Sequence, residues 1–320
     1  MSEFATTPPI PYVNIGDQAA AVRAAINVYS KLETYSQTEV DAFFFNRAPD
    51  ADVTAYIAAV ETALGTTIEA ALPSAVNPKH KIYNFVTAEK AAGRWGLHKR
   101  IYLPIYNNTA ASAIDLVSRL SGTFTGLGSV THAPGYVQGN GTSGYFDFNV
   151  TPTALGLTQS SGMVFALHKT APSGTAEKVS VSSIDGTDIT KAVDFNFRAT
   201  DIHFSYNAAT TGSGAIDATL ARASQNGIII GSRQGGSRSV FRRNSSAFTN
   251  LLTQVGGDFG TIPTTKTFAA MRSQYGTGVA YSDVQMGAYG AGLGLTEAQA
   301  NGFSANLKTL WESLTGLALP

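Results

Sequence analysis

The sequence has no cysteine among its 320 residues, and it carries little charge. Without cysteine the chain forms no disulfide, no cysteine-ligated zinc or iron–sulfur site and no thiol nucleophile. Charged residues make up 14% of the chain, against about 25% in a typical soluble domain. The 22 basic side chains balance the 22 acidic ones, so we expect neither a nucleic-acid partner nor a strongly charged tail.

Long apolar runs are also missing. No run approaches the roughly 18 apolar residues of a membrane-spanning helix, so we expect no membrane partner. The first residues have neither the basic nor the apolar region of a Sec signal peptide. Instead the sequence is rich in glycine, at 32 positions, and in serine and threonine, which predicts a surface that is polar but uncharged.

The length suggests about two domains, preceded by an arm. Residues 1–48 are predicted to form this extended arm with short helices, because the proline-rich stretch 8–11 excludes helix and central strand. Ser30 and Ser36 each begin a Ser-x-x-Glu sequence, the capping box of a helix start. We expect this arm to attach the protein to a partner.

Residues 49–121 are predicted to form a small helical domain. Apolar residues recur with helical spacing from Val53 until Gly65 ends the helix. Asn77 followed by Pro78 predicts the start of another helix, with Asn77 as its N-cap.

Residues 122–320 are predicted to form an antiparallel β-sandwich of the jelly-roll type. From about residue 122 the apolar period becomes two, and Gly/Ser/Asn turns separate short segments. A capping box at Thr296 begins a final helix, and Gly316 ends it. The predicted fold class is therefore α+β, with the arm and the helical region followed by the sandwich and a C-terminal helix.

One loop matches a nucleotide-binding motif. Residues 139–144 read G-x-G-x-x-G, which binds a pyrophosphate only where a helix follows. The next residues alternate like a strand, so we interpret the loop as a turn. None of the five histidines forms a metal-spaced pair. His168 and His203 lie on the polar phase of strands, which favours a solvated or hydrogen-bonded side chain over a ligand or base.

The carboxylates give the main argument about catalysis. Glycosidases need two acids beside the scissile bond. Between residues 122 and 292 the one glutamate is Glu177, in a Ser/Gly/Lys-rich loop, and the aspartates are scattered. We therefore expect a protein that is not an enzyme, with no catalytic residue, cofactor or metal. Residues 185–188 leave two alternatives open, a tight turn or a weak calcium loop.

Four arginines without an acid lie within residues 233–243. A basic hairpin here could contact a sulfated or phosphorylated glycan or a nucleic acid. An ordinary exposed hairpin, or one paired with an acidic neighbouring subunit, is favoured over these. The candidate ligand or subunit contacts are Arg233, Arg238, Arg242 and Arg243.

Several segments resemble parts of bacteriophage structural proteins. Residues 135–147 resemble G-x-x-G-D/N-G-S/T-S/T-x-Y-F/I/L-D/N, the opening strand of concanavalin A-like (LamG-type) jelly rolls in those proteins. Residues 227–233 look like their middle strand. Residues 281–290, leading into 294–299, are similar to their last strand and closing helix. Segment 51–92 resembles the helices that precede such jelly rolls.

The arm also resembles a phage component. Residues 29–33 and 35–41 look like the Y-S/T-K-x-E-V-D units of phage tail fibres. The candidate attachment residues are Tyr29, Tyr35, Val40, Phe43 and Phe44.

The resemblance, which covers about residues 50–320, implies a bacteriophage virion structural protein: a tail fibre, baseplate or other particle-surface component. Such a protein would be anchored by its N-terminal region to other virion proteins and would form a homo-oligomer. Its lectin-like sandwich would serve subunit contacts or bind a host-surface glycan. Two alternatives remain open: a soluble lectin-like carbohydrate-binding module and a polysaccharide-degrading enzyme.

Overall fold

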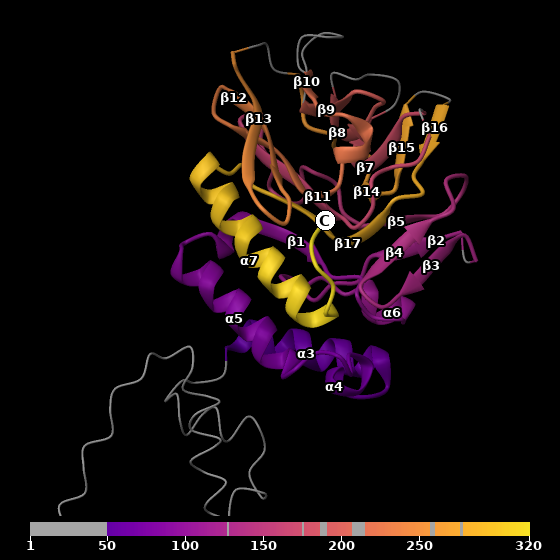
Figure 1. Ribbon diagram of the computed structural model, residues 1–320. Coiled ribbons are helices and arrows are strands. Elements are labelled where there is room, and N and C mark those ends of the chain that lie inside the picture. Colours follow the sequence, from indigo (N-terminus) through magenta and orange to yellow (C-terminus); the bar gives the residue numbers. More distant parts are fainter. Residues whose placement is uncertain are drawn as a thin grey trace, which may run out of the picture. The chain divides into compact units, whose positions relative to one another are not determined.

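The computed structural model describes residues 50–126, 128–174, 176–185, 191–206, 215–256, 260–275 and 278–320 (Figure 1). The predicted arm, its two capping boxes and the five attachment residues lie outside these ranges. Residues 50–320 form one compact unit. The division of this unit into a helical domain, 49–121, and a sandwich domain, 122–320, stays a prediction.

The N-terminal helices begin and end largely where their caps predict. They are α3 (Ala51–Leu64), α4 (Ile68–Ala71) and α5 (Pro78–Ala91). Asp50 accepts hydrogen bonds from the first turn of α3, and Gly65 ends that helix with a left-handed φ of 67°. Asn77 does precede α5, but its own φ is 52° and its side chain caps nothing. The proline at the first helical position is therefore the stronger signal at this start.

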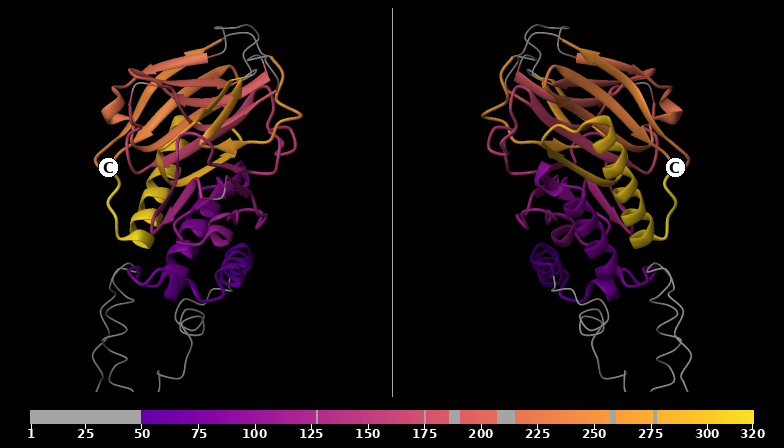
Figure 2. Two further views of the ribbon diagram at one scale, coloured as in Figure 1. Left: turned by 90° about the vertical axis from the view of Figure 1, so that its right-hand side faces the viewer. Right: turned by 90° about the vertical axis from the view of Figure 1, so that its left-hand side faces the viewer.

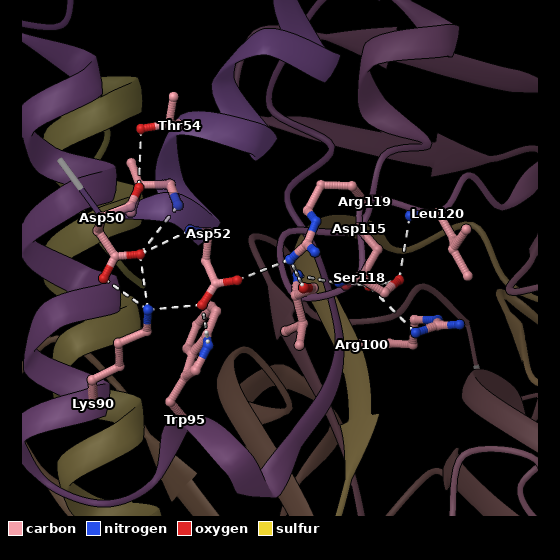
Figure 3. Close-up of polar contacts among 12 residues, drawn as sticks. Asp50, Asp52, Thr54, Lys90, Trp95, Arg100, Asp115, Ser118, Arg119 and Leu120 are labelled. Carbon is pink, nitrogen blue, oxygen red and sulfur yellow. Dashed lines mark hydrogen bonds and ion pairs between the residues drawn. The ribbon is translucent and has the colours of Figure 1, made fainter.

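A polar network fixes the start of α3 (Figure 3). Lys90 Nζ lies 2.7 Å from both Asp50 Oδ2 and Asp52 Oδ2. Trp95 Nε1 donates to Asp52 Oδ2 at 3.1 Å, and Arg119 pairs with the other oxygen of Asp52 at 3.1 Å. This network ties α3 to α5 and to the loop before the sandwich.

The strands form two antiparallel sheets and a separate hairpin. In spatial order the eight-stranded sheet is β13 (Phe248–Val255), β12 (Ser237–Arg243), β11 (Gly227–Gln234), β6 (Ser161–His168), β17 (Gln285–Gly292), β4 (Tyr136–Gly139) and β3 (Val130–Ala133), with β1 (His98–Tyr102) also pairing β17. The seven-stranded sheet is β10 (Ala215–Thr219), β9 (Asp201–Tyr206), β8 (Ala192–Phe197), β7 (Lys178–Ile184), β14 (Ala269–Ala270), β5 (Tyr145–Asp147) and β2 (Thr123–Thr125). The hairpin is β15 (Arg272–Tyr275) and β16 (Gly278–Tyr281). This arrangement confirms the predicted antiparallel sandwich.

The eight-stranded sheet is buried on both faces. On β6, Val164 and Ala166 point into the core between the two sheets. Met163, Phe165 and Leu167 point to the opposite face, where they join a second apolar core with the helices. The strand was expected to alternate apolar and polar positions; because it is covered on both sides, both of its phases are apolar.

The C-terminal helix α7 (Glu297–Thr315) covers that second face together with α5 and α3, as Figures 1 and 2 show. Its predicted capping box at Thr296 and its end at Gly316 are both confirmed. The ring of Phe303 packs edge-on against the ring of Phe165 of β6, with 4.9 Å between the ring centroids. A Cβ at Gly287 of β17 would lie 2.3 Å from Trp311 Nε1, so glycine is needed for this close approach. None of the helices in the described ranges is both long and apolar enough to cross a membrane.

A buried carboxylate joins three elements of the helical layer. Glu89 of α5 is fully buried and accepts from Arg94 Nη2 at 2.7 Å and from Asn306 Nδ2 of α7 at 2.7 Å. Its other oxygen lies 2.9 Å from His98 Nε2 at the start of β1. Burial acts to raise the pKa of Glu89, but the hydrogen bonds from His98 and Arg94 outweigh it and lower the pKa to about 2.

We expect the Glu89 carboxylate to make the free energy of unfolding fall at low pH. Because the folded pKa lies below the unfolded value of 4.5, its stabilisation is complete above about pH 4.5 and is lost as the pH falls towards 2, by about 3 kcal/mol at most. Urea unfolding between pH 7 and 2.5 measures this slope. Glu89→Gln flattens the curve in that window, and Glu312→Gln, at a partly exposed position of α7, leaves it unchanged. Equal slopes in all three proteins would contradict the assignment.

Candidate functional site

The outer face of the seven-stranded sheet carries two rows of polar side chains. The strand register places Ser182, Asp194 and Ser205 side by side on β7, β8 and β9. The neighbouring row consists of Asn196 of β8, His203 of β9 and Asp217 of β10. The intervening residues of the same strands point into the core between the sheets; they are Val181, Val193, Phe195, Phe197, Ile202, Phe204 and Tyr206. The alternation of these strands thus separates an apolar inner face from a polar outer one.

A hollow of about 370 Å³ opens on this polar face. The end of β8, the start of β7 and the β15–β16 hairpin form its walls. Its lining residues are Glu177, Val179, Ile184, Asp194, Asn196, Arg198, His203, Ser273, Val279 and Ala280. Because charged and amide groups from three strands converge here, we take this hollow as the candidate functional site.

One amide group joins the two carboxylates of the hollow. Asn196 Nδ2 donates to Glu177 Oε1 at 2.7 Å and also to Asp194 Oδ2. Asp194 is 5% exposed, and burial raises the pKa of its carboxyl, although the nearby His203 acts in the opposite direction. Among the described residues, neither Asp194 Oδ1 nor Asn196 Oδ1 has a hydrogen-bond partner. The hollow therefore offers two buried acceptors to an incoming donor.

An arginine connects the two polar rows at the rim. Arg198 Nη1 donates to Asp217 Oδ1 at 3.0 Å, and its Nε lies 3.8 Å from Glu177 Oε1. The same oxygen of Asp217 lies 2.7 Å from His203 Nδ1. The positive charge of Arg198 thus lies beside the negative charges of both Glu177 and Asp217.

This set of groups suits a ligand with hydroxyl groups better than a metal. Within the described ranges, no three histidine, aspartate or glutamate side chains are grouped so as to hold an ion.

The pair of Glu177 and Asp194 also bears on catalysis. In the sequence Glu177 is an isolated loop residue, whereas the structure places a second carboxylate beside it through Asn196.

A smaller hollow, of about 180 Å³, lies on the other side of the hairpin. Its lining residues are Asp147, Ser182, Ser183, Ile184, Lys266, Thr267, Ala269 and Arg272. Nearby, the carboxylate of Asp185 accepts from Thr264 N at 2.8 Å, Thr265 Oγ1 at 2.7 Å and Lys266 N at 2.9 Å. Asp188, the other carboxylate of the possible calcium loop, lies outside the described residues, so both alternatives for that loop stay open.

The four arginines singled out by sequence do not form one exposed patch. Arg233 and Arg238 face each other across β11 and β12 and are fully buried. Arg242 donates to Asn226 at the backbone oxygen, 2.9 Å, and at Oδ1, 2.7 Å. Arg243 Nε donates to Ser304 of α7 at 2.8 Å. Arg242 and Arg243 thus contact residues of the same chain, and a role of the four arginines in binding a ligand or a second subunit stays a prediction.

The glycine loop and the histidines have local roles. Asn140 Oδ1 accepts hydrogen bonds from the backbone of Thr142, Ser143 and Gly144, and strand β5 follows directly. This confirms the turn. His168 is hydrogen-bonded to Ser180 at 3.0 Å, and its burial lowers its pKa to about 3. His203 is hydrogen-bonded as described above, so the hydrogen-bonded interpretation is correct for both and solvation is not.

Sequence reasoning missed Asp194, Asn196 and Arg198. The signal was present: β8 places Asp and Asn at alternate positions of an otherwise apolar strand, although both residue types are rare in strands. A polar phase of this kind on neighbouring strands indicates a sheet face that is not packed against an apolar core.

No family model matches the chain, and no curated protein matches it. The fold is similar to Trypanosoma rangeli sialidase in complex with sialic acid, at 10% identity and a TM-score of 0.46, over 66% of this chain and 33% of that one. It is also similar to the botulinum neurotoxin serotype D/C VPI 5993 binding domain, at 10% identity and a TM-score of 0.49, over 67% and 53% of the two chains. The binding domain of botulinum neurotoxin DC in complex with SialylT gives 10% identity and a TM-score of 0.48, over 67% and 52%.

The chain thus spans about a third of the sialidase and about half of the toxin chains. At these TM-scores the structural similarity does not indicate a ligand or an activity for this chain. Both have to be inferred from the residues of the hollow.

We expect Asp194 to reduce stability as it ionises. Because its folded pKa lies above the unfolded value of 3.8, the free energy of unfolding falls as the pH rises from about 4 through the folded pKa. Denaturant unfolding at pH 4 to 8 measures this fall. Asp194→Asn removes it, whereas Asp217→Asn, at the exposed rim, retains it. A wild-type curve without the fall, or one unchanged by Asp194→Asn, would contradict the expectation.

Proposed function

We propose that the protein is a non-enzymatic structural component of a bacteriophage virion, whose sandwich binds a glycan of the host surface in the hollow of the seven-stranded sheet. The virion assignment is supported by the sequence resemblance of residues 50–320 to phage jelly rolls and of residues 29–33 and 35–41 to tail-fibre units. In this proposal the N-terminal region attaches the chain to other virion proteins.

The observation that carries the binding function is the polarity of the hollow. Asp194 Oδ1 and Asn196 Oδ1 are buried acceptors without partners in the described part of the chain, and a buried acceptor left unpaired costs about 1–3 kcal/mol. A sugar hydroxyl that donates to such an oxygen recovers this cost. Arg198 at the rim supplies donors for ring and hydroxyl oxygens of the same ligand.

Subunit contacts are the second part of the proposal. We propose that the chain assembles as a homo-oligomer within the particle. The uncharged surface predicted from the composition, with 14% charged residues, suits contact between identical chains because few charges need to be desolvated.

One observation favours a different function, that of a polysaccharide-degrading enzyme. Glu177 and Asp194 share a donor on Asn196, and one of the two has a raised pKa. This is the composition that glycoside hydrolysis requires. We keep the binding function as the main proposal because binding needs only the two acceptors that have no partner in the described ranges, Asp194 Oδ1 and Asn196 Oδ1, whereas hydrolysis needs both carboxylates released from Asn196.

The virion assignment is tested by mass spectrometry of purified particles. Peptides of this chain, at a constant ratio to the known capsid protein of the same particles through successive gradients, support the proposal. Their loss on purification would contradict it.

The binding assignment predicts that Arg198→Ala weakens glycan binding by about tenfold or more, because hydrogen bonds to a charged group are lost. The measurement is a glycan array followed by titration with the best ligand, using the full chain. The matched control is Arg119→Ala: Arg119 is equally exposed (37% against 38%), and it pairs with Asp52 at 3.1 Å much as Arg198 pairs with Asp217 at 3.0 Å.

An equal effect of the two substitutions would contradict binding in the hollow. Cleavage of the bound glycan that is lost in Asp194→Asn, but kept in Asp217→Asn, would replace the binding function by the enzyme.

A further inference from the structure

Negative charge exceeds positive charge in the hollow of the seven-stranded sheet. Glu177 and Asp194 both line the hollow, and among its described lining residues Arg198 is the one lysine or arginine. Arg198 Nη1 lies 3.0 Å from Asp217 Oδ1 at the rim, whereas its Nε lies 3.8 Å from Glu177 Oε1. The charge of Arg198 is therefore balanced mainly at the rim, and an excess of negative charge remains at Glu177 and Asp194.

Asp194 contributes to this excess because it has no ion pair in the described part of the chain. The ion pairs of this region join Arg198 to Glu177 and Asp217, and His203 to Asp217. Burial raises the pKa of the Asp194 carboxyl; His203 acts against this shift, and the charge of Glu177 adds to it. Because a neighbouring cation favours the ionised form of a carboxyl group, a positively charged ligand group is stabilised beside this pair.

The groups of the hollow that still need a partner are acceptors. Asp194 Oδ1 and Asn196 Oδ1 belong to side chains of residues that are each 5% exposed, and neither oxygen has a hydrogen-bond partner among the described residues. The contacts of Glu177 with Asn196 and Arg198 both use its Oε1, which leaves Oε2 for a ligand. A protonated primary amine carries three donors, no acceptor and a positive charge. It therefore matches these three oxygens in number and in charge.

The remaining surface of the hollow suits a sugar ring. Val279, which is 41% exposed, and Ala280 supply apolar surface on one wall, where the C–H face of a pyranose ring can pack. Arg198 at the rim donates to ring and hydroxyl oxygens. The volume of about 370 Å³ lies within the range of small-molecule sites.

We propose that the ligand of the hollow is an amino sugar with a free, protonated amine, whose ammonium group binds between Glu177 and Asp194. This inference rests on the proposed binding function and names the class of its ligand. An N-acetylated sugar offers an amide with one donor and no charge, and an acidic sugar brings a negative charge to the two carboxylates. Both therefore bind less tightly than the amino sugar.

Two ligands that differ only at the amine test the assignment. Binding of the full chain to a glucosamine oligomer and to an N-acetylglucosamine oligomer of the same length is measured by titration calorimetry at about pH 6, below the pKa of an ordinary amine. We expect the glucosamine oligomer to bind about tenfold more tightly or better. Equal or tighter binding of the acetylated oligomer would overturn the amino-sugar ligand.

A change of one carboxylate to an amide locates the ammonium group. Glu177→Gln is expected to weaken binding of the glucosamine oligomer by about tenfold and to change binding of the acetylated oligomer little. The matched control is Glu69→Gln. The side chain of Glu69 is 47% exposed against 43% for Glu177, and it pairs with Lys79 at 3.3 Å much as Glu177 pairs with Arg198 at 3.8 Å. An equal effect of the two substitutions would overturn the placement at Glu177.

Further ligands separate the sources of the amine and the two proposals. Spermidine carries ammonium groups without a sugar ring, and we expect it to bind at least about tenfold more weakly than the glucosamine oligomer; equal affinity would overturn the saccharide. Tighter binding of a neutral or sialylated glycan overturns the amino-sugar ligand while the binding function stands. Failure of the wild-type chain to bind any saccharide overturns the binding function as well.

Discussion

The burial of the eight-stranded sheet on both faces is the constraint from which the rest of the architecture follows. Met163, Phe165 and Leu167 of β6 need a cover on one side, and Val164 and Ala166 need one on the other. The helices α3, α5 and α7 supply the first cover, and the seven-stranded sheet supplies the second. The outer face of the seven-stranded sheet lies beyond both cores, and this is where Asp, Asn and His can replace apolar side chains without opening a core.

The polar groups of the candidate site lower the stability of the fold. Asp194 and Asn196 each keep one oxygen that has no hydrogen-bond partner among the described residues, in a place where an apolar residue would pack without penalty. Proteins tolerate such groups mainly where function requires them, because the surrounding structure supplies the stability that the site gives up. In this chain that stability comes from the two apolar cores and from buried ion pairs such as that of Glu89 with Arg94.

Sequence patterns within a few residues predicted the helix ends and the antiparallel strands. They did not predict burial, which depends on residues far away in the chain. The capping box at Thr296 and the glycines at 65 and 316 act within one turn of helix, so sequence was sufficient there. The second buried face of β6 was missed because only one phase of the strand was considered, although Met163 to Leu167 are all apolar. The chain also gave no local sign that Arg233 and Arg238 would be buried rather than exposed on a hairpin.

The hollow was unpredictable for the same reason. Glu177 precedes β7, Asp194 lies on β8 and Asp217 lies on β10, so their meeting depends on three strand registers and on the irregularity between Val179 and Val181. Each residue had a plausible separate role as a loop or surface carboxylate. Only the pairing of the strands turns them into neighbours.

The position of strand β17 affects how the protein folds during synthesis. It lies in the middle of the eight-stranded sheet, pairs with β1, β4 and β6, and supplies residues to both cores. Its pairing of Met286 with Val137 joins positions that are far apart in the chain. During synthesis, neither the sandwich nor the helical layer can therefore close until the last strand has left the ribosome. Because such long-range pairing is slow, the exposed edges of β4 and β6 must remain protected from other chains until then.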